Sequence, residues 1–127
     1  MVSVSEEKTL LEFETDYFGI KGNKEGVLKI PKEHYTLTNE RILIRKQGVM
    51  TKTLNDIELF KVKDISVNQT LTDKVRNVGD IIVISANESN RRITLKKVKN
   101  PHEVKEEIRS AAKAATEKAG ISYKYDL

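Results

Sequence analysis

Residues 35–45 have the sequence Tyr-Thr-Leu-Thr-Asn-Glu-Arg-Ile-Leu-Ile-Arg, which predicts a β-hairpin. Two short apolar-rich runs meet at Asn39 and Glu40, and asparagine tolerates the positive φ that a tight turn requires. Short extended segments separated by turn residues continue on both sides, up to about residue 99. The hairpin is therefore expected to lie within an antiparallel sheet.

The other strands are predicted from alternating apolar and polar residues and from the turn residues that bound them. Val62–Asn68 alternates most regularly, as is typical of a strand with one face in solvent. Lys8–Glu14 places Leu11 and Phe13 between acids and predicts an edge strand. Further strands are predicted at Val27–Ile30, Val49–Leu59 after a turn at Gln47–Gly48, Ile81–Ala86 and Arg91–Lys97, the last two as a hairpin. Residues 70–79 predict a loop whose Leu71, Val75 and Val78 pack inward.

The pattern becomes helical after Asn100. Asn100 is a candidate N-cap, Pro101 suits the first helical position, and Glu103 suits the first turn. One narrow apolar stripe follows at helical spacing, formed by Val104, Ile108, Ala111, Ala115 and Ala119. Gly120 is expected to end this helix in a left-handed conformation. Strands followed by one amphipathic helix predict an α+β fold.

Composition limits the class of protein. The chain has 127 residues, 38% hydrophobic and 33% charged, which fits one domain over residues 1–127. The longest aliphatic run, residues 81–84, is far shorter than the roughly 20 residues of a transmembrane segment, and we expect none. No secretory signal is visible and there is no cysteine, so we expect a cytoplasmic protein without disulfides.

The motif Tyr35-x-Leu37-Thr38-x-x-Arg41-Ile42 resembles the opening signature of bacterial pleckstrin-homology-like (bacterial PH) domains. The resemblance extends over roughly residues 33–118 through four further motifs, which are Ile57-x-Leu59, Val62-x-x-Ile65-x-Val67, Val78-Gly79-Asp80-Ile81 and the helix start at Asn100-Pro101. It implies a single PH-like domain: a strongly bent, seven-stranded antiparallel sheet or barrel, capped by one C-terminal amphipathic helix. Residues 1–32 then form an N-terminal extension with one or two strands, and residues 120–127 form a tail. The family-signature residues with implied structural roles are Tyr35, Leu37, Thr38, Arg41, Gly79 and Asp80.

Three features depart from that family. Its members often carry membrane-spanning helices beside the domain, whereas this sequence predicts none. Glu58 stands where proline is expected, and Asn77 stands where glycine is frequent. The second change is mild because asparagine also accepts left-handed geometry.

The excess of basic residues lies between residues 65 and 99, a stretch that contains seven basic and three acidic residues. They form a possible anionic contact surface made of Lys74, Arg76, Arg91, Arg92, Lys96, Lys97 and Lys99. Alternation should place Arg92, Thr94 and Lys96 on one side of a strand. The other interpretation is a solvated sheet face whose positive charge prevents edge pairing.

Other classes of function find little support. Phosphoinositide-binding PH domains use a long basic loop between their first two strands, whereas the turn at Asn39 and Glu40 is tight. His34 and His102 lie in different elements without clustered acids, so we expect no metal site. Adjacent acids such as Glu106 and Glu107 diverge on a helix, no nucleophile or phosphate-loop motif occurs, and we expect neither catalysis nor a cofactor. No aromatic residue interrupts the basic run, which argues against nucleic-acid binding.

The sequence therefore predicts a non-catalytic binding or scaffold module that contacts an unknown protein or a second copy of itself. Sheet edges and the alanine-rich helix face offer the contact surfaces, and Arg41 is expected to be structural. The alternative is a peripheral module with weak electrostatic binding to anionic membrane lipids. No apolar anchor is expected beside the basic residues, which would limit that binding to low salt.

Overall fold

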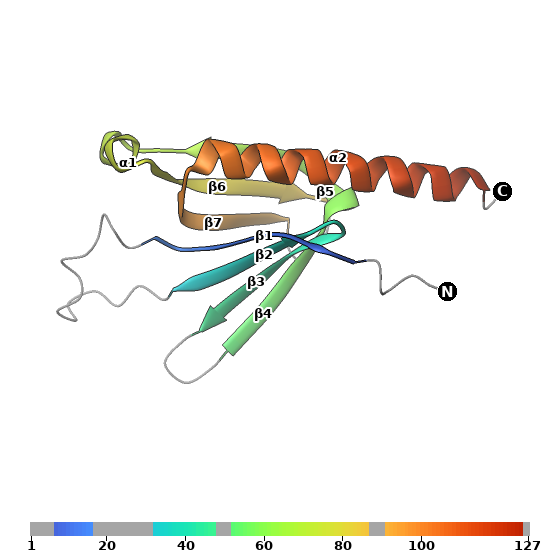
Figure 1. Ribbon diagram of the computed structural model, residues 1–127, viewed down its shortest axis with the longest axis horizontal. Coiled ribbons are helices and arrows are strands. Elements are labelled where there is room, and N and C mark those ends of the chain that lie inside the picture. The colour runs from blue at the N-terminus through green and yellow to red at the C-terminus, as the bar shows by residue number, and fades with distance from the viewer. Residues whose placement is uncertain (1–6, 17–31, 48–51, 87–90, 126–127) are drawn as a thin grey trace.

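Two antiparallel sheets and one long helix make up the computed structural model, which describes residues 7–16, 32–47, 52–86 and 91–125 (Figure 1). The first sheet has the order β1 (Thr9–Glu14), β2 (Glu33–Thr38), β3 (Arg41–Gln47) and β4 (Lys52–Glu58). The second has the order β5 (Val62–Asn68), β6 (Val78–Ser85) and β7 (Arg92–Lys99). A 3-10 turn, η3 (Leu59–Lys61), joins β4 to β5, α1 (Leu71–Arg76) joins β5 to β6, and α2 (Pro101–Tyr125) follows β7.

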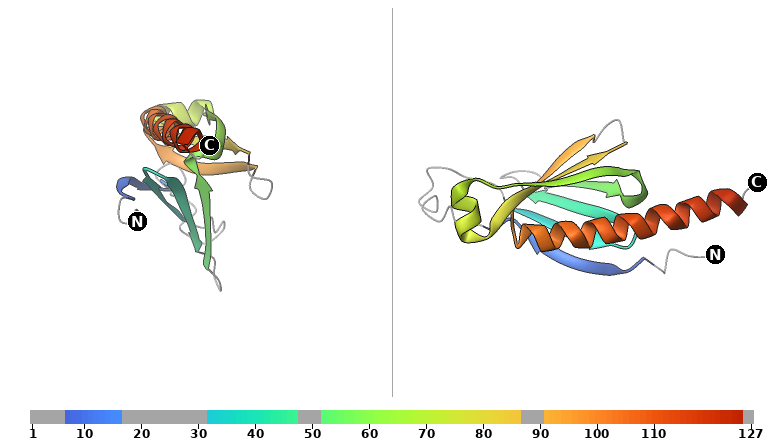
Figure 2. Two further views of the ribbon diagram at one scale, coloured as in Figure 1. Left: turned by 90° about the vertical axis from the view of Figure 1, so that its right-hand side faces the viewer. Right: turned by 90° about the horizontal axis from the view of Figure 1, so that it is seen from above.

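The predicted α+β class with seven antiparallel strands is confirmed, but the strands do not close into a barrel. The chain turns through η3 between β4 and β5, so these two strands belong to different sheets. The helix α2 packs against η3, β5 and β6 at this opening (Figure 2). It supplies the apolar surface that a closed barrel would take from paired strands.

The hairpin at residues 35–45 forms as predicted, but it joins β2 to β3 and not the first two strands of the domain. The interpretation of the tight turn at Asn39 and Glu40 as the connection between the first two strands is therefore wrong, and this turn does not speak against a phosphoinositide-binding loop between β1 and β2. Leu37 pairs with Ile42, and the Thr38 hydroxyl accepts hydrogen bonds from the backbone N–H groups of Glu40 and Arg41, each at 3.0 Å. The alternate residues Tyr35, Leu37, Ile42 and Ile44 are buried. The hairpin thus presents one apolar face to the core, as its period of two requires.

The core lies between the two sheets and α2. Ile108 is fully buried, and it joins Leu59, Ile81 and Leu95 in one cluster. Ala111 and Ala112 are also buried, whereas Ala115 and Ala119 are only half-buried. The decrease in burial along the apolar stripe agrees with Figure 1, in which the C-terminal turns of α2 extend beyond the sheets.

Residues 70–79 are not the loop that the sequence predicts. Residues 71–76 form α1, and Leu71 and Val75 are 82% and 86% exposed instead of packing inward. Val78 does pack inward, as the first residue of β6. The helix forms because Thr70 and Asp73 make a capping box, with the Thr70 hydroxyl accepting from the Asp73 N–H at 3.0 Å.

Both ends of α2 differ in detail from the prediction. The helix begins at Pro101 as expected, but Asn100 has a φ of 52°, unlike the extended conformation of an ordinary N-cap. The helix also passes Gly120 and continues to Tyr125, so the predicted end is wrong, as is the separate tail. One glycine costs a helix only about 1 kcal/mol, which the alanine-rich turns before it can offset.

Three predicted features lie outside the described residues, in whole or in part. They are the strand at Val27–Ile30, the turn at Gln47–Gly48, and the turn residues 87–90 of the last hairpin. Of the N-terminal extension, β1 is described, and it is the edge strand of its sheet as predicted.

Candidate binding surfaces

The predicted basic surface is divided between the two ends of the second sheet. Arg92 pairs with Ile84 at one end of β7, and Lys99 pairs with Val78 at the other. At about 3.3 Å per residue these two ends are roughly 20 Å apart, beyond the Debye length of about 8 Å at physiological salt. The hairpin end holds Arg91 and Arg92, and the end beside α1 holds Lys74, Arg76, Lys97 and Lys99 (Figure 1). Lys96 lies between the two ends, in the interior of β7. The seven residues therefore do not form one surface.

A bulge in β7 separates Lys96 from Lys97. The register shifts between Gly79 and Ile81, and Lys97 has a φ of 49°, a left-handed conformation that costs about 1 kcal/mol in a residue with a side chain. The Asp80 carboxylate accepts a hydrogen bond from the Lys97 backbone N–H at 3.0 Å and holds this conformation. The predicted alternation of Arg92, Thr94 and Lys96 on one side thus ends at Lys97.

Lys97 is engaged in an ion pair inside the domain. Its ammonium lies 3.0 Å from both carboxylate oxygens of Asp73, which is 7% exposed. Burial by itself raises the pKa of the Asp73 carboxyl, but hydrogen bonds from Lys97 and from the Thr70 backbone hold that pKa below its ordinary value. Lys97 therefore contributes to the attachment of α1 and is not available for an external anion.

The outer face of α1 is apolar. Successive helical residues turn by about 100°, so Leu71 and Val75 share the face opposite the buried Asp73. Lys74 is exposed on the same short helix. We call Leu71, Lys74 and Val75 the α1 tip; Figure 1 shows α1 at the end of the molecule opposite the C-terminus.

A groove of about 990 Å³ lies between β5 and α2, and we call it the β5–α2 groove. Its apolar lining comes from Val62, Ile65 and Ala112. Its charged lining comes from Lys63, Asp64, Lys105, Glu106, Arg109, Lys113 and Glu117. The strand β5 is the edge of its sheet, so the groove has a strand edge on one side and a helix on the other (Figure 2).

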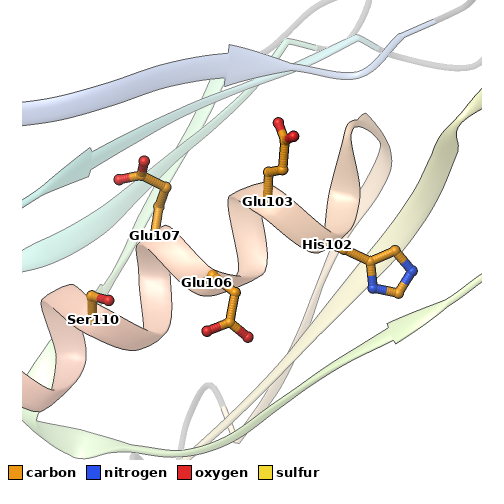
Figure 3. A pocket seen from close by; sticks show the side chains of 5 residues that line it. All are labelled: His102, Glu103, Glu106, Glu107 and Ser110. Carbon is orange, nitrogen blue, oxygen red and sulfur yellow. The ribbon is translucent and has the colours of Figure 1, made fainter.

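The titratable side chains at the start of α2 do not converge. Figure 3 shows Glu106 and Glu107 on different sides of the helix, as the sequence indicates for adjacent residues. His102 contacts Gln69 at 3.1 Å, whereas His34 contacts Glu14 in the first sheet at 3.2 Å. Within the described ranges, no three His, Cys, Asp or Glu side chains are grouped to hold a metal ion.

The signature residues make contacts within the domain. The Tyr35 hydroxyl donates to the buried Glu33 carboxylate at 2.6 Å and accepts from the Lys96 N–H at 2.9 Å, which joins the two sheets. Burial, followed by the hydrogen bond to Glu33, raises the pKa of Tyr35. Leu37 belongs to the core, Thr38 closes the hairpin, and Asp80 holds the bulge, so these side chains have local structural roles.

Arg41 connects the hairpin to two other segments. Its guanidinium donates to Glu7 at 2.9 Å and to Asp56 on β4 at 3.2 Å. The hydrogen bonds from Arg41 and then from Thr38 lower the pKa of the Glu7 carboxyl. These contacts support the interpretation of Arg41 as structural.

Gly79 lies where three segments meet. A Cβ built at this position would be 2.7 Å from Cγ of Gln69, 3.2 Å from the Pro101 ring and 3.3 Å from the Asn68 carbonyl oxygen. Asn77 has φ 58° and ψ 43°, and its side chain donates to that of Asn100. The left-handed geometry that the sequence allows for Asn77 is therefore present.

Comparison with known protein families gives a match. The family model described as bacterial PH domain matches residues 26–112, more than half of the chain. No curated protein matches the chain. Among the described residues, no helix has the combination of length and apolar character needed to cross a bilayer.

Proposed function

This chain belongs to the bacterial PH domain family, and we propose that it is a non-catalytic binding module for an extended segment of a partner protein. PH domains are generally binding modules, which is the coarse function that family membership suggests. The proposed site is the β5–α2 groove. The bound segment would add a strand to the free edge of β5 and be covered on its other side by α2.

The position of β5 at the edge of its sheet is the observation that carries this proposal. Within the described residues β5 pairs with β6 alone, so one row of its backbone N–H and C=O groups has no strand partner, and Val62–Ile65 of this strand line the groove. An added strand gains affinity from main-chain hydrogen bonds and specificity from pockets for alternate side chains. Val62, Ile65 and Ala112 provide an apolar lining for such side chains.

The charges in the groove favour a partner segment over uncontrolled pairing between copies. Lys63 and Asp64 are exposed on β5, and charged residues on an edge strand oppose pairing with a second identical edge. Arg109 and Glu106 lie 3.7 Å apart on the helical wall. A segment with both apolar and charged side chains suits this mixed lining.

Two other surfaces receive less support. The β1 edge exposes Leu10 at 48%, but the chain just after β1 is already held by a bridge from Thr15 to Val98 of β7. Self-association through β1 remains a prediction. The weak electrostatic lipid surface would need its basic residues on one face, whereas Arg92 and Lys99 lie at opposite ends of β7.

Selection from a peptide display library on the immobilised full chain tests the proposal. A selected peptide should protect the β5 amides, residues 62–68, from hydrogen exchange. The Thr116→Tyr variant, which adds bulk to the groove wall, should weaken binding about tenfold or more. The matched Ala114→Tyr variant, on an exposed position of α2 outside the groove lining, should bind normally. Protection of β1 instead of β5, or equal binding by the two variants, would contradict the proposed site.

A further inference from the structure

Leu71 and Val75 are the two most exposed large apolar side chains among the described residues. They lie four positions apart on α1, so they project side by side from one face of the helix. Single exposed apolar residues are common, but adjacent ones on a projecting element indicate a contact surface.

The α1 tip is held in place from three sides. The capping box of Thr70 and Asp73 fixes the start of α1, and Asn77 ends it in a left-handed conformation with its side chain bonded to Asn100. The ion pair between Asp73 and Lys97 attaches the inner face to β7. Because the tip is already ordered, little conformational entropy is lost when it binds.

The charged groups around the α1 tip leave positive charge on the outside. Lys74 is exposed on α1, and Lys99 is exposed at the end of β7, paired in register with Val78. Asp73 binds the Lys97 ammonium, and Asp80 accepts a hydrogen bond from the Lys97 backbone N–H. Figure 3 shows the Glu103 side chain on α2 pointing in a different direction from that of His102.

We propose that the α1 tip inserts into the surface of an anionic lipid bilayer. Leu71 and Val75 would enter the interfacial region, while Lys74 and Lys99 remain beside the negatively charged headgroups. Shallow insertion of a few apolar side chains next to basic residues is sufficient for reversible membrane binding. Two aliphatic side chains are too few for a stable protein interface, which buries about 800 Å² on each partner. The exposed Leu71 and Val75 correct the expectation that no apolar anchor lies beside the basic residues.

Fluorescence provides a direct test because the chain contains no tryptophan. The Leu71→Trp variant should show a blue shift with vesicles of phosphatidylserine and phosphatidylcholine, and lipids brominated on the acyl chain should quench it. The matched variant Leu54→Trp replaces a residue that is 66% exposed on β4 of the other sheet, and it should show neither effect. No blue shift in Leu71→Trp, or equal shifts in both variants, would overturn the proposal.

Vesicle sedimentation gives a second, independent readout. Replacing Leu71 and Val75 together by serine should lower partitioning at least about tenfold, and both sites are so exposed that folding should be unaffected. Lys74→Ala should lower it severalfold, with the difference shrinking as salt rises. The groove variant Thr116→Tyr should bind vesicles like the unmodified protein, so this test is separate from that of the proposed peptide site. Binding that survives the double serine change, or that is equal on pure phosphatidylcholine, would refute insertion of the α1 tip.

Discussion

The carboxylate of Asp73 and the ammonium of Lys97 lie 3.0 Å apart and connect α1 to β7 across the second sheet. Lys97 reaches Asp73 from a bulge in which its backbone is left-handed. The unfavourable backbone conformation is therefore coupled to a favourable ion pair. Together they determine that Asp73 faces inward and that Leu71 and Val75 face solvent.

Replacing Asp73 by asparagine should destabilise the domain by about 2 kcal/mol, because the change leaves the partly buried ammonium of Lys97 without its counter-charge. Chemical denaturation of both proteins at neutral pH measures this difference. Glu106→Gln is the control, since it removes an exposed pair with Arg109 and should change stability by less than about 1 kcal/mol. Equal effects of the two changes would show that the ion pair of Asp73 contributes no more to the free energy of unfolding than the exposed pair of Glu106.

Stability should fall in acid through Asp73 and Glu7. Both carboxyls have pKa values below their ordinary values of 3.8 and 4.5, so their contribution is fully present above those values. It is lost as the pH falls through the lower pKa of the folded state. Urea denaturation between pH 2 and 7 should show this loss, and Asp73→Asn should reduce its slope below pH 4. A slope unchanged by that substitution would contradict the assignment to Asp73.

Replacing Ile108 by aspartate should cost about 3–5 kcal/mol, because it places an unpaired charge in the core beneath α2. Thermal melting followed by circular dichroism measures the effect. Ser110→Asp introduces the same charge two residues later at an exposed position and should change little. If Ile108→Asp melts within a few degrees of the unmodified protein, α2 does not close the core.

The glycine in β6 and the glycine in α2 should respond oppositely to alanine. Gly79→Ala should destabilise the domain by about 1–3 kcal/mol, because the new Cβ meets the Pro101 ring and a backbone carbonyl. Gly120→Ala should stabilise it by up to about 1 kcal/mol, since no atom lies within 4 Å and alanine favours a helix. Denaturation midpoints of the two variants provide the comparison. If both substitutions raise stability, or both lower it, then the close contacts at Gly79 do not explain the effect of adding a Cβ there.

Self-association through the β1 edge is a separate prediction. Light scattering at about 100 μM should report a species larger than a monomer if the dissociation constant is in the micromolar range. Leu10→Lys should then shift the protein towards monomer, because a charge replaces an exposed apolar side chain on the edge strand. Monomer alone in the unmodified protein would exclude this mode at that concentration.

The sequence predicted the elements that local patterns determine. The hairpin at residues 35–45 follows from the turn at Asn39 and Glu40, and β5 follows from alternation over Val62–Asn68. The helix start follows from Pro101. In each case the deciding residues are neighbours along the chain, so their spacing carries the information.

The surfaces depend on contacts between distant residues, which spacing does not reveal. The capping box of Thr70 and Asp73 was a readable helix signal, but the direction in which Leu71 points depends on Lys97, 24 positions after Asp73. The dense basic run suggested one surface, whereas an extended strand separates its ends. The β5–α2 groove depends on how α2 packs beside β5, which no single stretch of sequence encodes.

The close packing at Gly79 has a consequence for how two ligands would influence each other. Gly79 touches the segment before α1 and the start of α2 with room for only a hydrogen, so the α1 tip and the groove are carried by one stiff junction. Coupling between two sites requires an element with two arrangements, and the close contacts at Gly79 leave no room for a second one. We therefore expect each intrinsic affinity to be independent of the other ligand. If the partner segment belongs to a membrane-bound protein, the gain comes from effective concentration alone. The domain would then bind most tightly where membrane and partner protein are present together, because of avidity and without a conformational change.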